Sequence, residues 1–262
     1  MTRPTTRVKF QLDNNLALRR AEYFYLGNID FGNLIIWFIV LLFSLSFHEA
    51  AHAWTSERFG DDTGRLQGRI TLNPMAHIDP VGTIVFPIVG FLTGFPLLGW
   101  AKPVQTNPLR WRDKTRANIS VSAAGPISNF ILASIAFIII KALIIGGVLF
   151  PIGGFFTMVV PAGAIFSGAP QSAYLEPLAK FLSVMLMLNI ALGVFNLIPV
   201  PPLDGSHVLE ELLPPSMSAA YEQIRPYGFI LLYALLLLGV FSAIFLPVTR
   251  LIEMLLGARR FG

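Results

Sequence analysis

The chain has 262 residues, of which 54% are hydrophobic and 13% are charged, about half the charged fraction of an ordinary soluble domain. Its net charge is only +4, and its basic residues lie between long uncharged runs, so intrinsic disorder, a coiled coil and a nucleic-acid partner are excluded. Without cysteine, the chain has no disulfide, thiol ligand or thiol nucleophile. We therefore expect a membrane protein in contact with the lipid bilayer.

Residues 1–30 form a polar N-terminal arm that carries five basic residues. No small-residue cleavage site follows the apolar run after it, so we do not expect a signal peptide. The alternation over 8–12 predicts a short strand, and the rest of the arm is expected to lie on the membrane surface. We expect residues 31–262 to form a single intramembrane domain.

The first apolar segment, 31–57, is long enough to cross a bilayer as a helix, and it contains three polar residues in the pattern H-E-x-x-H. His48 and His52 are four residues apart, so both imidazoles lie on one face of the helix. Two such imidazoles can bind Zn²⁺, and Glu49 can then act as a general base toward a metal-bound water. Ionisable groups in a membrane helix are expensive, which favours a functional role for these three residues.

This pattern lies close to one end of the predicted helix. Counted from Phe31, His48 and His52 lie about 25 Å and about 31 Å along the helix axis. The hydrocarbon core of a bilayer is about 30 Å thick. A short path for water from one membrane face to the site is therefore expected.

The remaining apolar segments differ in composition. Residues 125–146, 178–198 and 227–246 are rich in Leu, Ile, Phe and Ala and predict helices. Residues 80–101 and 147–173 are apolar but interrupted by Pro and Gly, which is typical of re-entrant segments buried against protein. We predict an all-α polytopic membrane protein with four to six transmembrane helices and a re-entrant, partly β-like membrane segment.

A catalytic zinc needs a third protein ligand, and several residues could supply it. Asp204 ends a long uncharged run and follows a proline-rich turn that can direct it into the helix bundle. His207, three residues later, competes with it. Spacing alone leaves the choice open, and the other titratable residues near apolar runs are Glu57, His77, Asp79, Glu210 and Glu211.

Five short motifs, taken in order, resemble those of the site-2 proteases, a family of intramembrane zinc metalloproteases. The likeness covers most of residues 31–248. The motifs are His48–His52, the stretch from Gly68 to Thr83, Gly99–Val104, Gly125–Asn129, and Asn196 to Gly205 with Pro199 between. The chain has room for neither a PDZ nor a CBS domain, so it resembles a minimal form of the family.

The resemblance implies one Zn²⁺ per chain, bound by His48, His52 and Asp204 rather than His207. It also implies that Glu49 is the catalytic base and that Asn196 helps to hold the substrate or its oxyanion. The implied reaction is hydrolysis of a peptide bond within or next to a transmembrane segment of a membrane-anchored protein, as in regulated intramembrane proteolysis. Another protease would trim some such substrates first.

A helical substrate must unwind before its carbonyls can be attacked, and pairing with an edge strand would offset the lost hydrogen bonds. The candidate edge consists of Gly99, Trp100, Ala101, Lys102, Pro103 and Val104. Asn129 is a further candidate for substrate contact. We expect His77 and Asp79 to hold a turn rather than a metal.

The basic residues predict the orientation of the chain. His52 and Asp204 must meet, so the helices that end there leave the membrane on the same face. If 80–101 is re-entrant, that face also carries loop 102–116, and it gathers most of the basic loop residues. The positive-inside rule makes it cytoplasmic. The compact core without accessory domains favours a prokaryotic cell membrane. The basic N-terminal arm then lies outside, against the rule.

Other classes of membrane metalloprotein share parts of this histidine pattern. A second class of membrane zinc proteases uses a Glu from a later E-x-x-x-D helix, but the only such match, Glu57 to Asp61, follows His52 too closely to fold back. Diiron desaturases need about eight His, and this chain has four. A membrane zinc transporter or a non-catalytic zinc-binding scaffold is the alternative.

Overall fold

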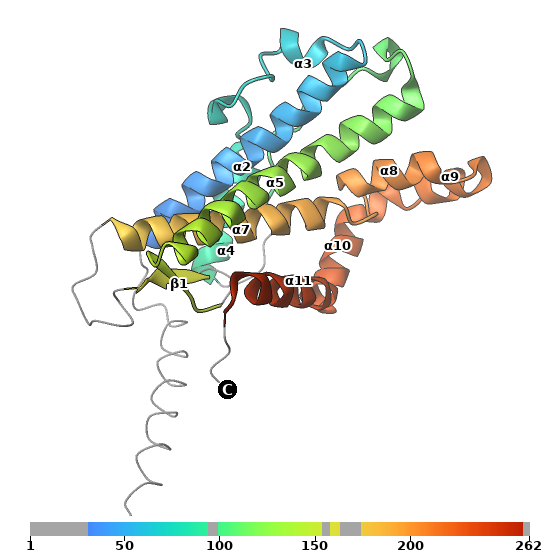
Figure 1. The fold of residues 1–262 in the computed structure, drawn as a ribbon. Coiled ribbons are helices and arrows are strands. Elements are labelled where there is room, and N and C mark those ends of the chain that lie inside the picture. The colour runs from blue at the N-terminus through green and yellow to red at the C-terminus, as the bar shows by residue number, and fades with distance from the viewer. Residues whose placement is uncertain (1–30, 94–98, 154–157, 163–173, 259–262) are drawn as a thin grey trace, which may run out of the picture.

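The computed structural model describes residues 31–93, 99–153, 158–162 and 174–258 (Figure 1). The expectations for the N-terminal arm, including the strand at 8–12, lie outside these residues.

Three long helices are apolar enough to cross a membrane: α2 (Phe31–Arg58), α5 (Lys114–Ile145) and α7 (Leu175–Asn196). The described part holds a fourth span if a bent pair counts as one, because η4 (Arg225–Tyr227) and α10 (Gly228–Leu237) continue into α11 (Val240–Leu256) across a 60° bend. The predicted helix at 227–246 is thus interrupted at Gly239, whose positive φ of 74° suits glycine. The all-α polytopic fold is confirmed, and its three to four spans only reach the lower limit of the four to six expected.

The sequence explains where two of these helices begin and end. Helix α5 starts 11 residues before the predicted 125–146, because the Asp113 side chain accepts a hydrogen bond from the N–H of Arg116 and caps a polar first part of the helix. Helix α7 ends at Asn196, and the proline-rich stretch after it turns the chain into α8 (Asp204–Leu212).

Helices α2, α5 and α7 lie side by side and form the centre of the molecule (Figure 1). Their contact surfaces combine large and small side chains. The small residues Ala133 and Ala136 of α5 let the helices approach closely. Large apolar side chains on the outer faces are exposed, as expected for contact with lipid. The main buried core contains Val40, Leu132, Ala133, Ala136, Ile140, Leu182, Met185 and Leu186.

The segment predicted to be re-entrant forms η2 (Pro80–Val85) and α4 (Phe86–Thr93), which are too short to cross a membrane. The Asp79 side chain caps η2 by accepting hydrogen bonds from the N–H groups of Val81 and Gly82. The N–H of Trp100 donates to the carbonyl of Gly82, so the chain returns to the start of the segment. Both ends therefore lie together, as a re-entrant path requires.

The β structure lies elsewhere than expected. Residues 99–104 are not a strand, because their partners are the irregular backbone around His77 and Gly82. The only strands in the described ranges are β1 (Leu149–Pro151) and β2 (Val159–Pro161), which pair antiparallel with Phe150 opposite Val160. They belong to the predicted segment 147–173. The shorter elements are α3 (Thr63–Leu66), η1 (Pro74–Ala76), η3 (Pro108–Arg110), η4 (Arg225–Tyr227), α9 (Pro215–Glu222) and α10 (Gly228–Leu237).

Candidate metal centre

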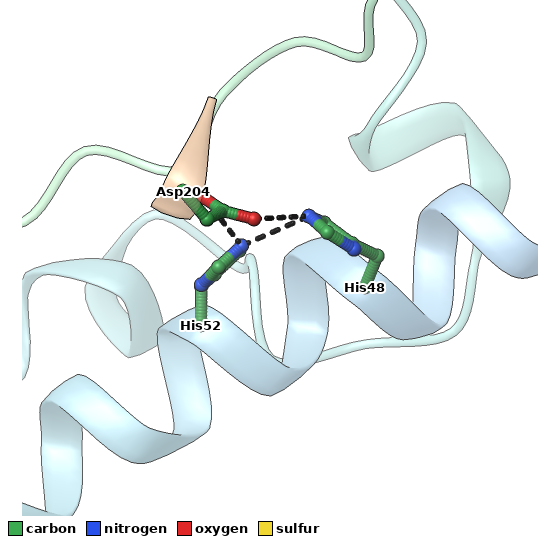
Figure 2. Close-up of side chains that lie close together, drawn as sticks. All are labelled: His48, His52 and Asp204. Carbon is green, nitrogen blue, oxygen red and sulfur yellow. Dashed lines mark hydrogen bonds and ion pairs between the residues drawn. The ribbon is translucent and has the colours of Figure 1, made fainter. Parts of the chain in front are cut away.

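His48, His52 and Asp204 converge at one point, although the aspartate lies far from the histidines in sequence (Figure 2). The Nε2 atoms of the two imidazoles are 3.0 Å apart. His48 Nε2 lies 3.1 Å from Asp204 Oδ2, and His52 Nε2 lies 3.5 Å from Asp204 Oδ1. This is the one group of potential metal ligands found among the described residues.

Helix α2 supplies both histidines, and the first turn of α8 supplies the aspartate. Gly205 makes this position of Asp204 possible. A Cβ on Gly205 would lie 2.3 Å from the Leu197 carbonyl oxygen, so only glycine lets the start of α8 lie against the end of α7. The sequence Asp204-Gly205 thus combines a ligand with the close backbone contact that places it.

Both imidazoles present an unprotonated Nε2 when neutral. His52 Nδ1 lies 2.6 Å from the backbone carbonyl of Val121, which can only accept, so this nitrogen carries the proton. His48 Nδ1 lies 2.7 Å from Asn129 Oδ1 in the same arrangement. Asp204 Oδ2 is buried and receives no hydrogen bond. Three acceptors therefore face one another without a donor, an arrangement that a cation stabilises.

The carboxylate is held in its ionised form. Burial by itself would raise the pKa of Asp204, but a positive charge between this carboxylate and the two imidazoles, whether a histidine proton or a cation in its place, outweighs burial and lowers this pKa below its ordinary value. Asp204 is therefore an acceptor at neutral pH, as a metal ligand must be.

The dimensions of the group suit zinc. Tetrahedral Zn²⁺ with N and O ligands at about 2.0 to 2.1 Å places the ligand atoms about 3.3 Å apart. The three measured separations lie between 3.0 and 3.5 Å. Gly125 of α5 leaves the space open, because a Cβ there would lie 2.4 Å from His52 Nε2 and 2.6 Å from His48 Nε2. Two imidazoles and one carboxylate are the donor set of a catalytic zinc site with one open position.

Glu49 lies on the same turn of α2 as His48 and is nearly buried, with 8% of its surface exposed. Its Oε2 accepts a hydrogen bond of 2.9 Å from the N–H of Val104, 55 residues later in the chain. The predicted base and the predicted substrate segment 99–104 are therefore in direct contact. That contact could not be deduced from the spacing of either motif.

Two buried charged residues that were not predicted as site residues hold the predicted substrate segment and the loop after it in place. The Arg69 guanidinium donates to the backbone carbonyls of Ala76, Lys102 and Pro103, at 3.4 Å and 3.3 Å for the last two. Arg69 belongs to one of the recognised motifs, yet only the tertiary contacts reveal its task. Its buried guanidinium attaches residues 102 and 103 to the loop that follows α3.

Asp61, just beyond α2, holds the next part of the loop. Its Oδ2 accepts hydrogen bonds from the N–H of Asn107 at 2.7 Å and from Ser56 Oγ at 2.9 Å, and its Oδ1 accepts from Thr63. Burial by itself would raise the pKa of Asp61, but these hydrogen bonds outweigh burial and lower it. In the sequence, Asp61 stood out only as the end of the E-x-x-x-D pattern that lies too close to His52 to supply a metal ligand.

The two predicted asparagines are differently placed. Asn196, the last residue of α7, is half-buried, and its Nδ2 donates to the Leu192 carbonyl at 3.0 Å. Asn129 is completely buried on α5, where its Oδ1 faces His48 Nδ1. The structure thus places Asn129 behind the histidine, on the side away from Nε2.

The other candidate ligands are bound to other groups. His77 Nε2 faces the Thr71 carbonyl, and Asp79 caps η2, as predicted for a turn. His207 is outside the converging group, and burial together with the positive charge of Arg225 lowers its pKa. The remaining pairs are Glu57 with Arg65, Glu210 with Arg225, and Glu211 with Asn118.

Comparison with known proteins agrees with this geometry. The model of peptidase family M50 matches residues 36–239. A protein of Bacillus subtilis (strain 168) named "Putative zinc metalloprotease YwhC" is 37% identical over 209 residues, covering 80% of this chain and 83% of the relative. Proteins named "Putative zinc metalloprotease Rip2" from Mycolicibacterium smegmatis and Mycobacterium tuberculosis are 31% and 30% identical over 75% of this chain, which covers 64% of each. No solved structure matches the chain.

The family match spans most of the chain and includes all three converging residues. The similar proteins are named as zinc metalloproteases, which agrees with the donor set of the converging group. The predicted resemblance, the enzyme class and the Zn²⁺ cofactor are thereby confirmed, and the family implies a protein substrate. The chain therefore belongs to peptidase family M50, the site-2 protease family, and is a multi-pass membrane zinc metalloprotease.

Proposed function

We propose that this enzyme hydrolyses a peptide bond within or next to a transmembrane segment of a membrane-anchored protein. The observation that carries the proposal is the position of the two histidines of the converging group on the membrane-length helix α2, with Glu49 beside them and the segment 99–104 in contact with Glu49. Because the group is buried, a bulky outer domain on the substrate would have to be removed first. A substrate already trimmed by another protease fits this restriction.

In the proposed reaction, His48, His52 and Asp204 bind one Zn²⁺. When bound, the ion lowers the pKa of a water toward about 7 and polarises the scissile carbonyl. Glu49 takes the proton from the attacking water and passes it to the amide nitrogen as the C–N bond breaks, so a new carboxyl and a new amine form. Asn196 would stabilise the oxyanion, worth about 3 kcal/mol for one well-placed donor, after turning its amide away from Leu192.

The segment Gly99–Val104 would hold the unwound substrate. Within the described residues, the N–H groups of Trp100, Lys102 and Val104 are bound to Gly82, His77 and Glu49. The N–H and C=O of Ala101 have no partner among the described residues and can pair with an added strand. Arg69 holds the neighbouring carbonyls of Lys102 and Pro103 in place, which would fix the position of this edge for such pairing.

Cysteine cross-linking tests this substrate position, because the chain has no cysteine of its own. We expect a disulfide between Lys102→Cys, an exposed position in the segment, and a cysteine beside the scissile bond of the substrate. Leu109→Cys is the matched control, since its side chain is 82% exposed but lies beyond the segment. Equal cross-linking from both positions would contradict a specific substrate edge.

Substitution of the third ligand tests the function and the ligand set together. We expect Asp204→Ala to lose most of its bound zinc and its cleavage of a membrane-anchored substrate, because two imidazoles alone leave the ion underligated. His207→Ala, in the same helix, should keep both. The measurements are zinc content of the purified protein by mass spectrometry and cleavage in proteoliposomes. Loss of zinc from the His207 variant alone would reverse the assignment.

We further propose that the site opens toward the cytoplasm of a prokaryotic cell. The support is the cluster of basic residues in the loops beside Asp204 and in 102–116, together with the positive-inside rule. The Leu109→Cys variant reports this orientation directly. Reaction with a membrane-impermeant thiol reagent only from the outside would contradict it.

A further inference from the structure

A chain of hydrogen bonds leads from His48 into the centre of the helix bundle. His48 Nδ1 lies 2.7 Å from Asn129 Oδ1, and Asn129 Nδ2 lies 2.9 Å from Asn189 Oδ1. Asn189 Nδ2 then lies 2.9 Å from Ser44 Oγ. We call these four residues the amide relay. The relay passes from α2 through α5 and α7 and returns to α2, one turn before His48.

The relay is surrounded by apolar helix interior. Ser44, Asn129 and Asn189 are each 0% exposed. An amide without partners in such surroundings is costly, and polar side chains inside membrane helices are functional candidates. No step proposed for the reaction uses Asn189, which does not touch Glu49, Asp204 or the substrate segment through any hydrogen bond among the described residues.

The direction of every hydrogen bond in the relay follows from one backbone group. Asn189 Nδ2 lies 2.9 Å from the carbonyl of Met185, which can only accept, so the amide nitrogen must point there. Asn189 then presents its oxygen to Asn129, which must donate with its own nitrogen. Asn129 therefore presents its oxygen to His48, and His48 must carry its proton on Nδ1.

The two histidines reach the same protonation pattern by different means. The backbone carbonyl of Val121 holds the proton on Nδ1 of His52, and no side-chain substitution removes that carbonyl. His48 depends on the amide of Asn129, which could turn by 180° and present a donor instead. Among the residues that the structure describes, the hydrogen bond to Asn189 is what keeps the oxygen of Asn129 toward His48.

We propose that Asn189, acting through Asn129, is a positioning residue that sets the tautomer and orientation of His48 and thereby the zinc affinity of the enzyme. The proposal gives Asn129 this supporting role in place of a substrate contact. It rests on the ligand role of His48 in the proposed function. Partners of this kind behind a metal-bound histidine fix the ring and keep the other nitrogen free for the ion.

The first test replaces Asn189 by leucine, which has a similar volume and no polar atoms. Asn129 then loses the acceptor that orients it, and its amide can present a donor to His48 Nδ1. We expect Asn189→Leu to bind zinc about 10- to 100-fold more weakly, the range found when such supporting partners are removed. Competition with a chelator of known affinity, on purified protein, gives this ratio without an activity assay.

A double variant separates positioning from packing. Asp at position 129 offers His48 Nδ1 a carboxylate, which accepts in either orientation and needs no help from residue 189. We therefore expect Asn129→Asp combined with Asn189→Leu to recover most of the zinc affinity lost in Asn189→Leu alone. If the two asparagines only stabilised helix packing, the double variant would bind zinc no better than the single variant.

The tautomer itself can be observed in the metal-free protein by nitrogen NMR of isotope-labelled histidine, since the chain has only four histidines. We expect a proton on Nδ1 of His48 in the natural protein and a shift of that proton toward Nε2 in Asn189→Leu. Ser183→Ala is the matched control, because it removes another completely buried polar side chain from α7, one whose hydrogen bonds among the described residues go to Met158 and Ala179 rather than to the site. It should leave the His48 signal unchanged.

The outcomes are distinct. Natural zinc affinity and an unchanged His48 tautomer in Asn189→Leu would overturn the proposal. If the natural protein bound no zinc, the proposed function would fail, and the tautomer of the metal-free protein would still decide the role of the relay.

Discussion

Replacing Glu49 by glutamine is expected to leave zinc bound and to slow peptide cleavage by about 10²- to 10⁴-fold, the usual contribution of a general base. Glutamine keeps the shape of the side chain, and its carbonyl oxygen can still accept the hydrogen bond from the Val104 N–H. It cannot take a proton from water. The loss should therefore appear in the rate of the chemical step, measured on a membrane-anchored substrate in proteoliposomes with zinc content determined in parallel.

Glu57→Gln is the matched control, since Glu57 lies on the same helix and pairs with Arg65. We expect it to keep full activity. The glutamine variant at position 49 also separates a protease from the alternative classes. A zinc transporter or a non-catalytic scaffold would keep its activity when the carboxylate is replaced, and unchanged cleavage in Glu49→Gln would remove Glu49 from the catalytic role.

Gly125→Ala is expected to abolish zinc binding, although the substitution adds only one methyl group. The new Cβ would lie within 2.4 to 2.6 Å of His52 Nε2 and of two atoms of the His48 ring, so it would fill the space between the ligands. The rings cannot move aside without losing their hydrogen bonds to Val121 and Asn129. Removing one supporting partner of a metal ligand weakens metal binding by up to about 100-fold. We expect Gly125→Ala to weaken zinc binding by more than this.

The substitution should not act by unfolding α5, because alanine is favoured over glycine in a helix interior by about 1 kcal/mol. Gly146→Ala, at the C-terminal end of the same helix, is the matched control. Its Cβ would lie 3.4 Å from the Ala142 carbonyl oxygen, an ordinary contact. Zinc content near one per chain in Gly125→Ala would show that the ion does not lie between His48 and His52.

The parts of the site that could be predicted from the sequence are those with local causes. The pair His48 and His52 depends only on helix periodicity, and the turn at Asp79 depends on a side chain that caps the residues after it. Asp204 required the family resemblance, because spacing alone could not decide between it and His207. What places Asp204 is the close approach of Gly205 to Leu197, a tertiary contact with no periodic signal.

The same distinction explains what was missed. The relay through Asn129 and Asn189 exists only because α5 and α7 pack with these residues opposite each other. The contact between Glu49 and Val104 likewise depends on how the chain returns from α4. The segment 227–246 was predicted as one helix from its apolar composition. Composition gives no sign of the left-handed backbone at Gly239, where the helix bends.

The most direct test of the central claim is to identify the cleavage products of a membrane-anchored substrate by mass spectrometry after reaction in heavy-oxygen water. The purified enzyme and its substrate would share one lipid bilayer, and a sample stripped of zinc by a chelator would serve as reference. We expect a new carboxyl end that carries heavy oxygen, located within or next to the transmembrane segment and formed only when zinc is present. Cleavage confined to soluble parts of the substrate, or cleavage that persists without zinc, would contradict the account.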